Sequence, residues 1–584
     1  MILDFNYKEP EVTLKKTSKR IAGLSISRLV LFFSMLAIII VGLSEIRWVL
    51  FLFFPVSILF VLSIKRFNKL KDRQAFLKGI LAVNDENHFR KVRDLSRFDQ
   101  GTEFIDKKHP FSNDLDLFGE HSLFQLLNHT VSGEGRYLLA QEMKAYHAVE
   151  KSQLRHSAIQ ELSTKKDFLL HFEAFGKAFL KEEKAKTGFY EWINTGNKWK
   201  DIFFLPIIIG PIVGLAVLLA TIVGYITPGW FSLWVLIGAI VLSWVLRPLM
   251  AASKVMPDEG DLKTYTAWAR LLEGISFQDE MLQTLQKPIY DDQFKASNSL
   301  KSLEQQSFMV QNRANLVYMI FNFLFWTDYV VLWRLERWKK RNKSHVHFWE
   351  TCFNEWQVLV SLAAFTEQEG THTPVEWTSQ FNLKAQEVKH PLIHPDKCVA
   401  NDFELKDGEK IVLLTGSNMS GKTTFMRTIG INLVLAGMGL SPFAKSFATG
   451  PFQLFTSMRN TDSLGESVSS FYAELARIKK LLDQAESGLP IFFLLDEILK
   501  GTNTTDRVMG SEALINQLRS TQSKGIISTH DIELADLEIA GVLNFSFHST
   551  IQQDEIIFDY KIKKGPCPSF NAHKLMELMG IKFN

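Results

Sequence analysis

The chain has few cysteines and almost no excess of charge. Its three cysteines, Cys352, Cys398 and Cys567, lie far apart and form no Cys-x-x-Cys pair. A disulfide framework or a zinc site is therefore not expected, and a reducing compartment fits. No carboxylate or cysteine cluster joins His390 and His394, so we expect both to be structural. The formal net charge of +3 gives no indication for or against nucleic acid.

Apolar residues are abundant and concentrated in long runs. Hydrophobic residues make up 46% of the 584-residue chain, with 47 Phe and 13 Trp. Two apolar runs, 29–43 and 48–64, are separated by a short polar turn, and residues 202–246 carry no charge and are divided by Thr227-Pro228-Gly229. A membrane span needs about 20 apolar residues. These runs predict two helical hairpins, and so four spans; pairs of buried core helices are the alternative.

Positive residues lie on one side of the predicted spans. Lysines and arginines precede the first and third spans and follow the second and fourth, whereas the connecting turns carry almost none. The positive-inside rule therefore places both termini and all large segments in the cytoplasm, in a multi-pass protein of the inner (cytoplasmic) membrane. A fifth apolar run, 316–333, is interrupted by Asn322, Thr327 and Asp328. We expect it to be a buried helix of a cytosolic domain.

A phosphate-binding pattern lies in the second half of the chain. Residues 416–423 read G-x-x-x-x-G-K-T, between an apolar strand (411–415) and a helix. In such a loop, successive backbone N–H groups and the helix N-terminus hold phosphate oxygens. The lysine reaches the outer phosphates and the threonine hydroxyl holds Mg²⁺. The pattern predicts an ATP site formed by Gly416, Ser417, Asn418, Met419, Ser420, Gly421, Lys422, Thr423 and Thr424.

Two further apolar strands end in polar residues. Asp496 and Glu497 end one of them, and His530 ends the other. One carboxylate at such a strand end can hold Mg²⁺, and the next can polarise an attacking water. We expect Asp496 to hold the metal and Glu497 to act as general base. His530 would lie near the terminal phosphate, with Lys422 as a third catalytic residue; a purely structural histidine is the alternative.

A helix is expected to begin near Ser469 or Ser470, ahead of leucines and an isoleucine at helical spacing. Either serine suits the N-cap, and Glu474 lies in the first turns. The positive end of this helix would attract an anion. In a head-to-tail dimer it would close over the nucleotide of the partner subunit. An ordinary capped helix is the alternative, and the residues leave both open.

Taken together, these motifs resemble those of the MutS family, ATPases known for DNA mismatch repair. The loop 416–427 is similar to the family's G-P-N-M-G-G-K-S/T-x-x-[ML]-[RK], 469–474 to S-T-F-x-x-E, 496–503 to D-E-x-x-[RK]-G-T-[ST], and 528–531 to the T-H segment that follows. Residues 122–139 and 361–363 are similar to the start and the end of that family's helical core.

The resemblance implies a multi-domain fold. A mainly α core, interrupted by the second membrane hairpin, would precede an α/β P-loop (ABC-type) ATPase domain with a mixed sheet flanked by helices. It also implies a homodimer formed through the ATPase domains, with Ser469 acting in trans, and an adenine-stacking residue at about Tyr560. The expected boundaries are 1–66 for the tail and first hairpin, 67–119 for a linker, 120–200 and 248–375 for the core, 201–247 for the second hairpin, and 376–584 for the ATPase domain.

The sequence departs from the family pattern in places. Ser417 replaces a proline and Ser420 a glycine, both by small residues that should preserve phosphate binding, and Leu499 replaces a glycine. The amino-terminal mismatch-reading domain and the DNA clamp have no counterpart in the sequence. Mismatch recognition therefore does not carry over from the motifs.

Three interpretations of function follow from these residues. The leading one is a membrane-anchored MutS-like ATPase whose nucleotide cycle moves the helical core. DNA is its candidate ligand, because the basic run 334–343 suits phosphates, although a solvated helix face would look the same. The second is an ABC-type membrane transporter ATPase, against which stand the lack of an L-S-G-G-Q-like signature and of intramembrane charge. The third is an ATP-dependent scaffold with no nucleic-acid ligand.

Overall fold

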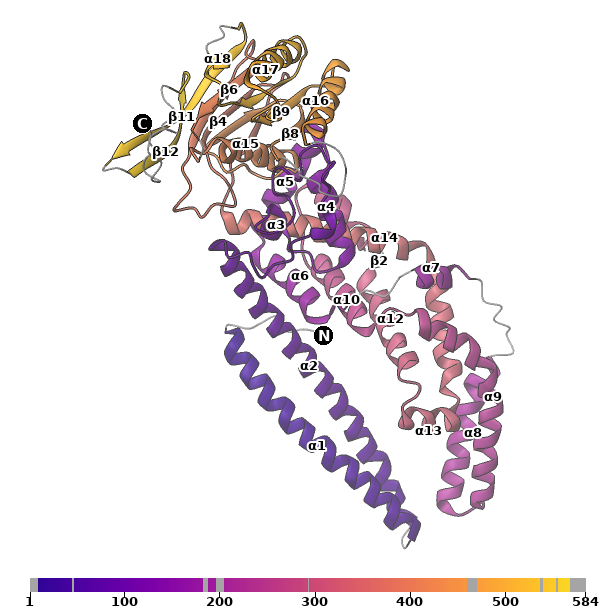
Figure 1. The fold of residues 1–584 in the computed structure, drawn as a ribbon. Coiled ribbons are helices and arrows are strands. Elements are labelled where there is room, and N and C mark those ends of the chain that lie inside the picture. Colours follow the sequence, from indigo (N-terminus) through magenta and orange to yellow (C-terminus); the bar gives the residue numbers. More distant parts are fainter. Residues whose placement is uncertain are drawn as a thin grey trace. The chain divides into compact units, whose positions relative to one another are not determined.

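The computed structural model describes residues 9–44, 47–181, 187–195, 204–291, 294–417, 419–459, 470–535, 539–552 and 555–567. The chain forms two compact units. Unit 1 comprises Met1–Glu86, Thr130–Arg136 and Lys165–Val360, and unit 2 comprises Asn87–His129, Tyr137–Thr164 and Ser361–Asn584. Most of the chain is helical, and the large sheets belong to unit 2 (Figure 1).

Unit 1 is almost entirely helical. Its helices are α1 (Pro10–Ser44), α2 (Phe53–Lys91), α6 (Lys166–Phe179), α7 (Thr187–Asn194), α8 (Phe204–Val223), α9 (Pro228–Val255), α10 (Glu259–Glu273), α11 (Glu280–Gln286), α12 (Ala296–Gln311), α13 (Leu316–Phe325) and α14 (Thr327–Glu369). A short 3₁₀ helix, Arg47–Leu52, precedes α2. The strands β1 (Tyr290–Asp291) and β2 (Phe294–Lys295) pair antiparallel. Helices α2 and α14 each end in unit 2.

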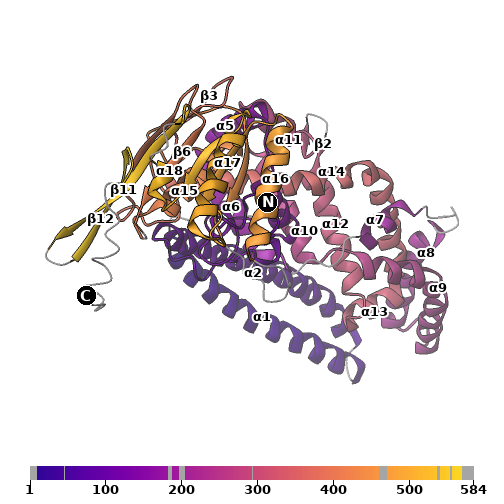
Figure 2. The same ribbon diagram turned by 45° about the horizontal axis from the view of Figure 1, so that its top comes forward.

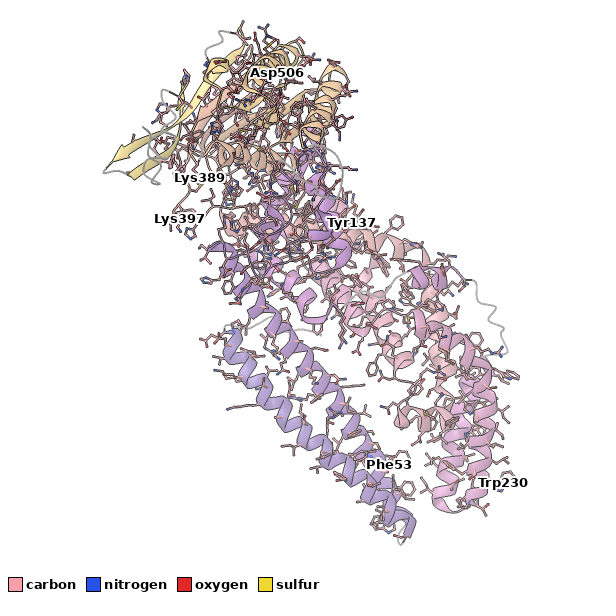
Figure 3. The ribbon with its side chains drawn as sticks, in the orientation of Figure 1. Phe53, Tyr137, Trp230, Lys389, Lys397 and Asp506 are labelled. Atoms are coloured by element: carbon pink, nitrogen blue, oxygen red, sulfur yellow. The ribbon has the colours of Figure 1, made fainter. Side chains whose placement is uncertain are left out.

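Four helices in the described part of the chain are long and apolar enough to cross a membrane. They cover Pro10–Gly42, Trp48–Lys91, Phe204–Val223 and Pro228–Val255, where the sequence predicts its four spans. Their most apolar stretches are 0% buried in the first two helices, 11% in the third and 17% in the fourth. Such exposure argues against the alternative of buried core helices. Helices α8 and α9 form a hairpin, with Trp230 near its closed end (Figure 3).

Helix α2 continues well beyond its apolar run. Four residues of its second half are buried at the spacing of one helical face: Phe76, Leu77, Ile80 and Val83. Phe76 stacks on Phe175 of α6, with 4.4 Å between the ring centroids. The segment 67–91, expected as the start of a linker, is therefore a helix whose residues up to Glu86 pack within unit 1.

The apolar run 316–333 is not the single buried helix that its composition suggested. The helix breaks at Trp326, whose φ is 53°, and the run divides into α13 and the start of α14. Trp326 stacks on Trp234 of α9 at 4.7 Å between centroids, and Trp234 Nε1 donates to Leu324 O at 2.9 Å. Three apolar side chains of α13 are exposed: Met319, Ile320 and Phe321.

The described residues of unit 2 form two sheets. The six-stranded sheet has the order β12-β11-β6-β10-β9-β8 and comprises β6 (Ile411–Gly416), β8 (Gln453–Ser457), β9 (Ile491–Asp496), β10 (Lys524–Ser528), β11 (Val542–Gln552) and β12 (Glu555–Lys564). All its neighbouring strands are parallel except β11 and β12. The four-stranded sheet has the order β3-β7-β4-β5 and comprises β3 (Val375–Trp377), β4 (Leu383–Val388), β5 (Asn401–Leu405) and β7 (Ser446–Thr449).

Helices cover both faces of the six-stranded sheet. Besides the ends of α2 and α14, the helices with residues in unit 2 are α3 (Leu123–Leu127), α4 (Gly133–Lys144), α5 (Val149–Ser163), α15 (Lys422–Gly437), α16 (Ser470–Glu486), α17 (Thr504–Arg519) and α18 (Ile532–Ala535), with a 3₁₀ turn at Thr102–Phe104. Alternate strand residues face opposite sides. Leu413 and Phe493 pack with residues of α16 and α17, whereas Leu494 faces Gly430 of α15. Figure 2 shows these helices beside the sheet. The expected mixed sheet flanked by helices is confirmed, and the carboxyl ends of β6, β9 and β10 share one edge.

The two segments that resemble the ends of a helical core meet in unit 2. Ser122 caps α3 in a capping box with Gln125. Ser361 Oγ donates to Leu127 O at 2.7 Å and accepts from His129 N at 2.7 Å. These hydrogen bonds join chain segments more than 200 residues apart.

His109 makes the stability of unit 2 depend on pH. Burial lowers the pKa of His109 from 6.5 to about 4, and its Nδ1 accepts from Phe111 N and Ser112 N at 3.4 and 3.2 Å. Because the folded pKa lies below the unfolded one, this contribution is complete above pH 6.5 and is lost as pH falls to about 4. We expect the thermal midpoint of the full chain in detergent to fall across that window, and less steeply in His109→Asn.

Asparagine suits this comparison because its side-chain oxygen accepts the same kind of backbone hydrogen bond and does not titrate there. His394→Asn is the matched control, since His394 Nδ1 accepts from Asp396 N at 3.3 Å in a turn of the same kind. An equal slope in the wild type and His109→Asn would contradict the assignment.

Candidate nucleotide-binding site

The loop between β6 and α15 lies at the carboxyl edge of the sheet. Gly416 has a φ of 147° and Gly421 a φ of 105°, values that other residues rarely adopt. A Cβ on Gly416 would lie 2.8 Å from Phe547 O, and one on Gly421 would lie 3.2 Å from the Tyr560 ring. Backbone conformation and space therefore both require glycine at these positions.

The two serines that depart from the expected loop pattern offer unused hydroxyls. Ser417 Oγ and Ser420 Oγ are buried and have no hydrogen-bond partner among the described residues. Leaving a buried polar group unsatisfied costs about 1–3 kcal/mol. A phosphate oxygen would accept from either hydroxyl, so the loop fits a phosphate group on this ground.

The remaining loop residues differ in their surroundings. Met419 has a φ of 65° and a side chain that is 83% exposed. Thr424 is exposed in the first turn of α15. Asn418 lies outside the described residues. Among the described residues, the side chains of Met419 and Thr424 make no contact that defines a role.

Lys422 is the first residue of α15 and turns back over the loop. Its Nζ donates to Gly416 O at 2.8 Å and to Ser417 O at 3.0 Å. Burial lowers the pKa of Lys422, and the neighbouring Glu497 and Asp496 oppose that shift. The buried amine is thus fixed within the loop, in reach of any anion that the loop holds.

Thr423 and Asp496 form the predicted metal pair. Thr423 Oγ1 donates to Asp496 Oδ2 at 2.6 Å, and Ser528 Oγ donates to Asp496 Oδ1. A hydroxyl beside a carboxylate is the oxygen donor set that Mg²⁺ prefers, so these residues fit the metal. The sequence did not single out Ser528; its position follows from the strand register, which places Ser528 opposite Asp496.

Glu497 contacts two basic side chains. His530 Nε2 lies 2.8 Å from Glu497 Oε1, and Lys500 forms an ion pair with the same carboxylate. The hydrogen bond from His530, followed by that from Lys500, lowers the pKa of Glu497 to about 2 against the opposing effect of burial. The carboxylate is therefore ionised at neutral pH. Sequence reasoning missed Lys500, although its spacing of three residues after Glu497 was a signal.

Helix α16 supports the loop that follows Glu497. Glu474 Oε1 accepts from Leu499 N at 2.5 Å, and a Cβ on Gly501 would lie 2.6 Å from Phe471 Cβ. Burial raises the pKa of Glu474. Sequence reasoning assigned no such contact to this motif. Ser469, expected to act in trans, lies outside the described residues, and α16 begins at Ser470.

The same loop holds a strained leucine. Leu499 has a φ of 58°, a left-handed conformation that costs a branched side chain about 1–2 kcal/mol. Its side chain is buried in the core shared by β9, α16 and α17. A Cβ on Gly510 of α17 would lie 2.8 Å from Leu499 Cδ1, so the leucine fits closely against that helix.

Tyr560 stands beside the phosphate loop. It lies on β12, its side chain is 46% exposed, and its ring is the neighbour that Gly421 leaves room for. Asn401 Nδ2 donates to Tyr560 O at 3.0 Å and fixes the backbone of the strand there. An exposed aromatic face is thus available at the position where the sequence comparison placed an adenine-stacking residue.

Comparison with known proteins gives matches to the carboxy-terminal part of the chain. The family model "MutS domain V" matches residues 412–581. Proteins named DNA mismatch repair protein MutS are 31% identical over 230 residues in Listeria welshimeri, 29% over 235 in Caldanaerobacter subterraneus subsp. tengcongensis and 34% over 208 in Macrococcus caseolyticus. The matched regions cover 38%, 39% and 34% of this chain but only 26%, 27% and 24% of those relatives. The chain thus spans about a quarter of their length, and its carboxy-terminal part, residues 412–581, is similar to domain V of the MutS family.

Proposed function

We propose that the protein is a membrane-anchored MutS-like ATPase that binds and hydrolyses ATP with Mg²⁺ at the loop between β6 and α15. The observation that carries the proposal is the convergence of polar residues from three strand ends at one edge of the sheet: Lys422, Thr423, Asp496, Glu497 and His530. The match to MutS domain V covers these residues and supports the proposal.

Each residue has a proposed role. The loop amides, the Ser417 and Ser420 hydroxyls and Lys422 would bind the phosphates, and Thr423 and Asp496 would hold Mg²⁺. When bound, Mg²⁺ neutralises charge on the phosphate oxygens. Glu497 would orient and polarise the attacking water. His530 and Lys500 hold the Glu497 carboxylate in place. Because the pKa of Glu497 is low, its contribution to the rate would come more from the way it positions the water than from its affinity for a proton.

Tyr560 gives the first test of the nucleotide site. Stacking of a base on an aromatic ring contributes about 1–3 kcal/mol, so we expect Tyr560→Ala to weaken ATP binding about tenfold and Tyr560→Phe to keep it. Titration calorimetry of the full chain in detergent, with Mg²⁺ present, measures both. Tyr137→Ala is the matched control, because Tyr137 is exposed on α4 (Figure 3).

Two outcomes have different meanings. Equal ATP affinity in the wild type and Tyr560→Ala would remove Tyr560 from the site and leave the rest of the proposal standing. A wild-type chain that takes up no ATP at millimolar concentration would end the proposal as a whole.

The membrane arrangement and assembly are part of the proposal. Helices α1, α2, α8 and α9 would span the inner membrane, with both termini and the ATPase domain in the cytoplasm. The exposed apolar stretches of these helices support this arrangement. The ATPase domains would pair in a homodimer, and Ser469 would reach the partner's nucleotide. The expected domain boundaries belong to the same proposal, with the first part of the expected linker, 67–91, formed by the end of α2.

The ligand that stimulates hydrolysis distinguishes the three interpretations. The relatives are named for DNA mismatch repair, which makes DNA the leading candidate here. DNA-stimulated hydrolysis that falls steeply as salt rises would support it. Stimulation by a solute in vesicles, without a response to DNA, would favour the transporter. A response to neither would favour the scaffold.

A further inference from the structure

A large recess lies in unit 1 between α2, α10, α12 and α14. Its volume is about 1330 Å³, and its charged lining comprises seven lysines and arginines against three carboxylates. Nothing in the proposed ATPase cycle uses this recess. This excess of positive charge suits an anionic ligand if the carboxylates are paired and cations without an acidic partner line the recess.

The three carboxylates are all paired. Lys263 Nζ lies 2.9 Å from Asp72 Oδ1 and 2.8 Å from Glu259 Oε1. Lys301 Nζ lies 2.6 Å from Glu304 Oε1. The contact between Asp72 and Lys263 also joins α2 to α10, so these two walls of the recess are held together.

Other cations of the lining have no acidic partner. Lys65 and Lys69 on α2, and Arg334 and Arg341 on α14, form no ion pair within the described part of the chain. All four are exposed. Because the lining has seven lysines and arginines against three carboxylates, the recess keeps a net positive charge, and these four cations lie on α2 and α14.

The basic run 334–343 of α14 is divided between different faces. Its three arginines, at i, i+3 and i+7, line the recess: Arg334, Arg337 and Arg341. Lys339 turns elsewhere, with its Nζ 3.2 Å from Thr195 Oγ1. Lys340 and Lys343 are exposed and do not line the recess. The three arginines thus share the part of α14 that lines the recess, whereas the lysines of the run do not line it.

Both basic walls begin where an apolar segment ends. Lys65 directly follows the apolar run 48–64. Arg334 directly follows Trp333, whose ring lies 6.3 Å from that of Phe204 at the start of α8. Aromatic rings and cations next to apolar spans mark the interface between membrane and water. The recess therefore lies at the cytoplasmic border of the proposed spans.

We propose that this recess binds the phosphate headgroup of an anionic phospholipid. Basic pockets beside membrane helices on the cytoplasmic side suit such headgroups. Phe308, which is 41% exposed, and Met309 also line the recess and offer apolar contacts for the rest of the lipid. A DNA duplex meets proteins over about 1,000 Å² or more, which a concave recess between four helices does not present. The inference rests on the proposed membrane anchoring and is independent of the ATP site.

The test measures binding of fluorescent phosphatidylglycerol, against phosphatidylcholine, to the full chain in neutral detergent micelles. We expect the wild type to prefer phosphatidylglycerol and the double variant Arg334→Gln/Arg341→Gln to lose about tenfold or more in affinity, because each cation near a headgroup contributes a several-fold effect. Lys340→Gln/Lys343→Gln removes the same charge from the same helix outside the recess and should bind like the wild type. Lys65→Gln/Lys69→Gln, on α2, should repeat the loss.

Contrary outcomes are distinct. Equal binding of the two lipids, or equal loss in the arginine and control variants, would overturn the inference. Inorganic phosphate that competes as strongly as the lipid would assign the recess to a free anion. If Arg334→Gln/Arg341→Gln weakened the binding of a short DNA duplex and left lipid binding unchanged, the recess would be assigned to nucleic acid. Carbonate extraction tests the anchoring separately: release of the chain from membranes refutes the anchor, whereas retention without a lipid preference refutes only the headgroup site.

Discussion

Glu497→Gln is expected to lower the rate of ATP hydrolysis at least about 100-fold and to leave ATP affinity nearly unchanged. Positioned acid–base groups contribute about 10²–10⁴ to rates, and Glu497 is the carboxylate that His530 and Lys500 hold at the edge of the sheet. Glutamine keeps the size of the side chain but lacks the negative charge that polarises water. A loss in kcat without a loss of binding is the signature of a group that acts in the transition state.

The measurement is steady-state hydrolysis by the full chain in detergent, together with ATP titration of the same samples. Glu376→Gln is the matched control, since Glu376 is exposed on β3 in the other sheet of unit 2. A Glu497→Gln protein that hydrolyses ATP at the wild-type rate would show that another residue activates the water.

Lys422→Ala is expected to weaken ATP binding about 10- to 100-fold, and hydrolysis with it. A hydrogen bond to a charged group contributes about 1.5–3 kcal/mol, and each 1.4 kcal/mol is a factor of ten in affinity. The Lys422 amine is buried within the loop, where its contacts with two carbonyl oxygens hold it beside the proposed phosphate position. Lys422→Ala removes this positive charge from the loop, and exposed cations elsewhere on the surface cannot take its place.

Titration calorimetry checks this affinity, and the rise in thermal midpoint on adding ATP checks it independently. Lys384→Ala, at an exposed position on β4, is the control. A Lys422→Ala protein with wild-type affinity would separate the loop from nucleotide binding. Together the two substitutions distinguish binding from chemistry, because Glu497→Gln should retain the first and Lys422→Ala should lose both.

Much of the candidate site was predictable because its pattern is local. A strand, a glycine-containing loop and a helix occur in sequence at 411–437, and parallel strands bring their carboxyl ends to one edge. Ser528, by contrast, reaches Asp496 only through the register of β9 and β10. Glu474 reaches Leu499 only because α16 crosses that loop. Contacts of this kind depend on tertiary packing, which no spacing in a single sequence encodes.

The fold, too, was predictable only in part. Four helices of membrane length were predictable because apolar runs are continuous in sequence. The break at Trp326 was not, since it depends on stacking against Trp234 almost 100 residues away. The division of the basic run between faces of α14 was equally unpredictable, because the Lys339 amine contacts Thr195, which lies on a different segment. Composition thus indicates that a helix forms, while its neighbours decide which side chains face them.

The packing of Leu499 explains how this chain can carry a leucine where the family pattern that its motif resembles has a glycine. Burying a leucine contributes about 1.5–3 kcal/mol, which is enough to offset the backbone strain at a φ of 58°. Contacts with α16 and α17 therefore impose the bend that glycine would otherwise adopt through its own flexibility. In this protein the shape of the turn beside the proposed catalytic carboxylates depends on packing in the hydrophobic interior, so mutations deep in that interior would reshape the turn without altering any polar residue in it.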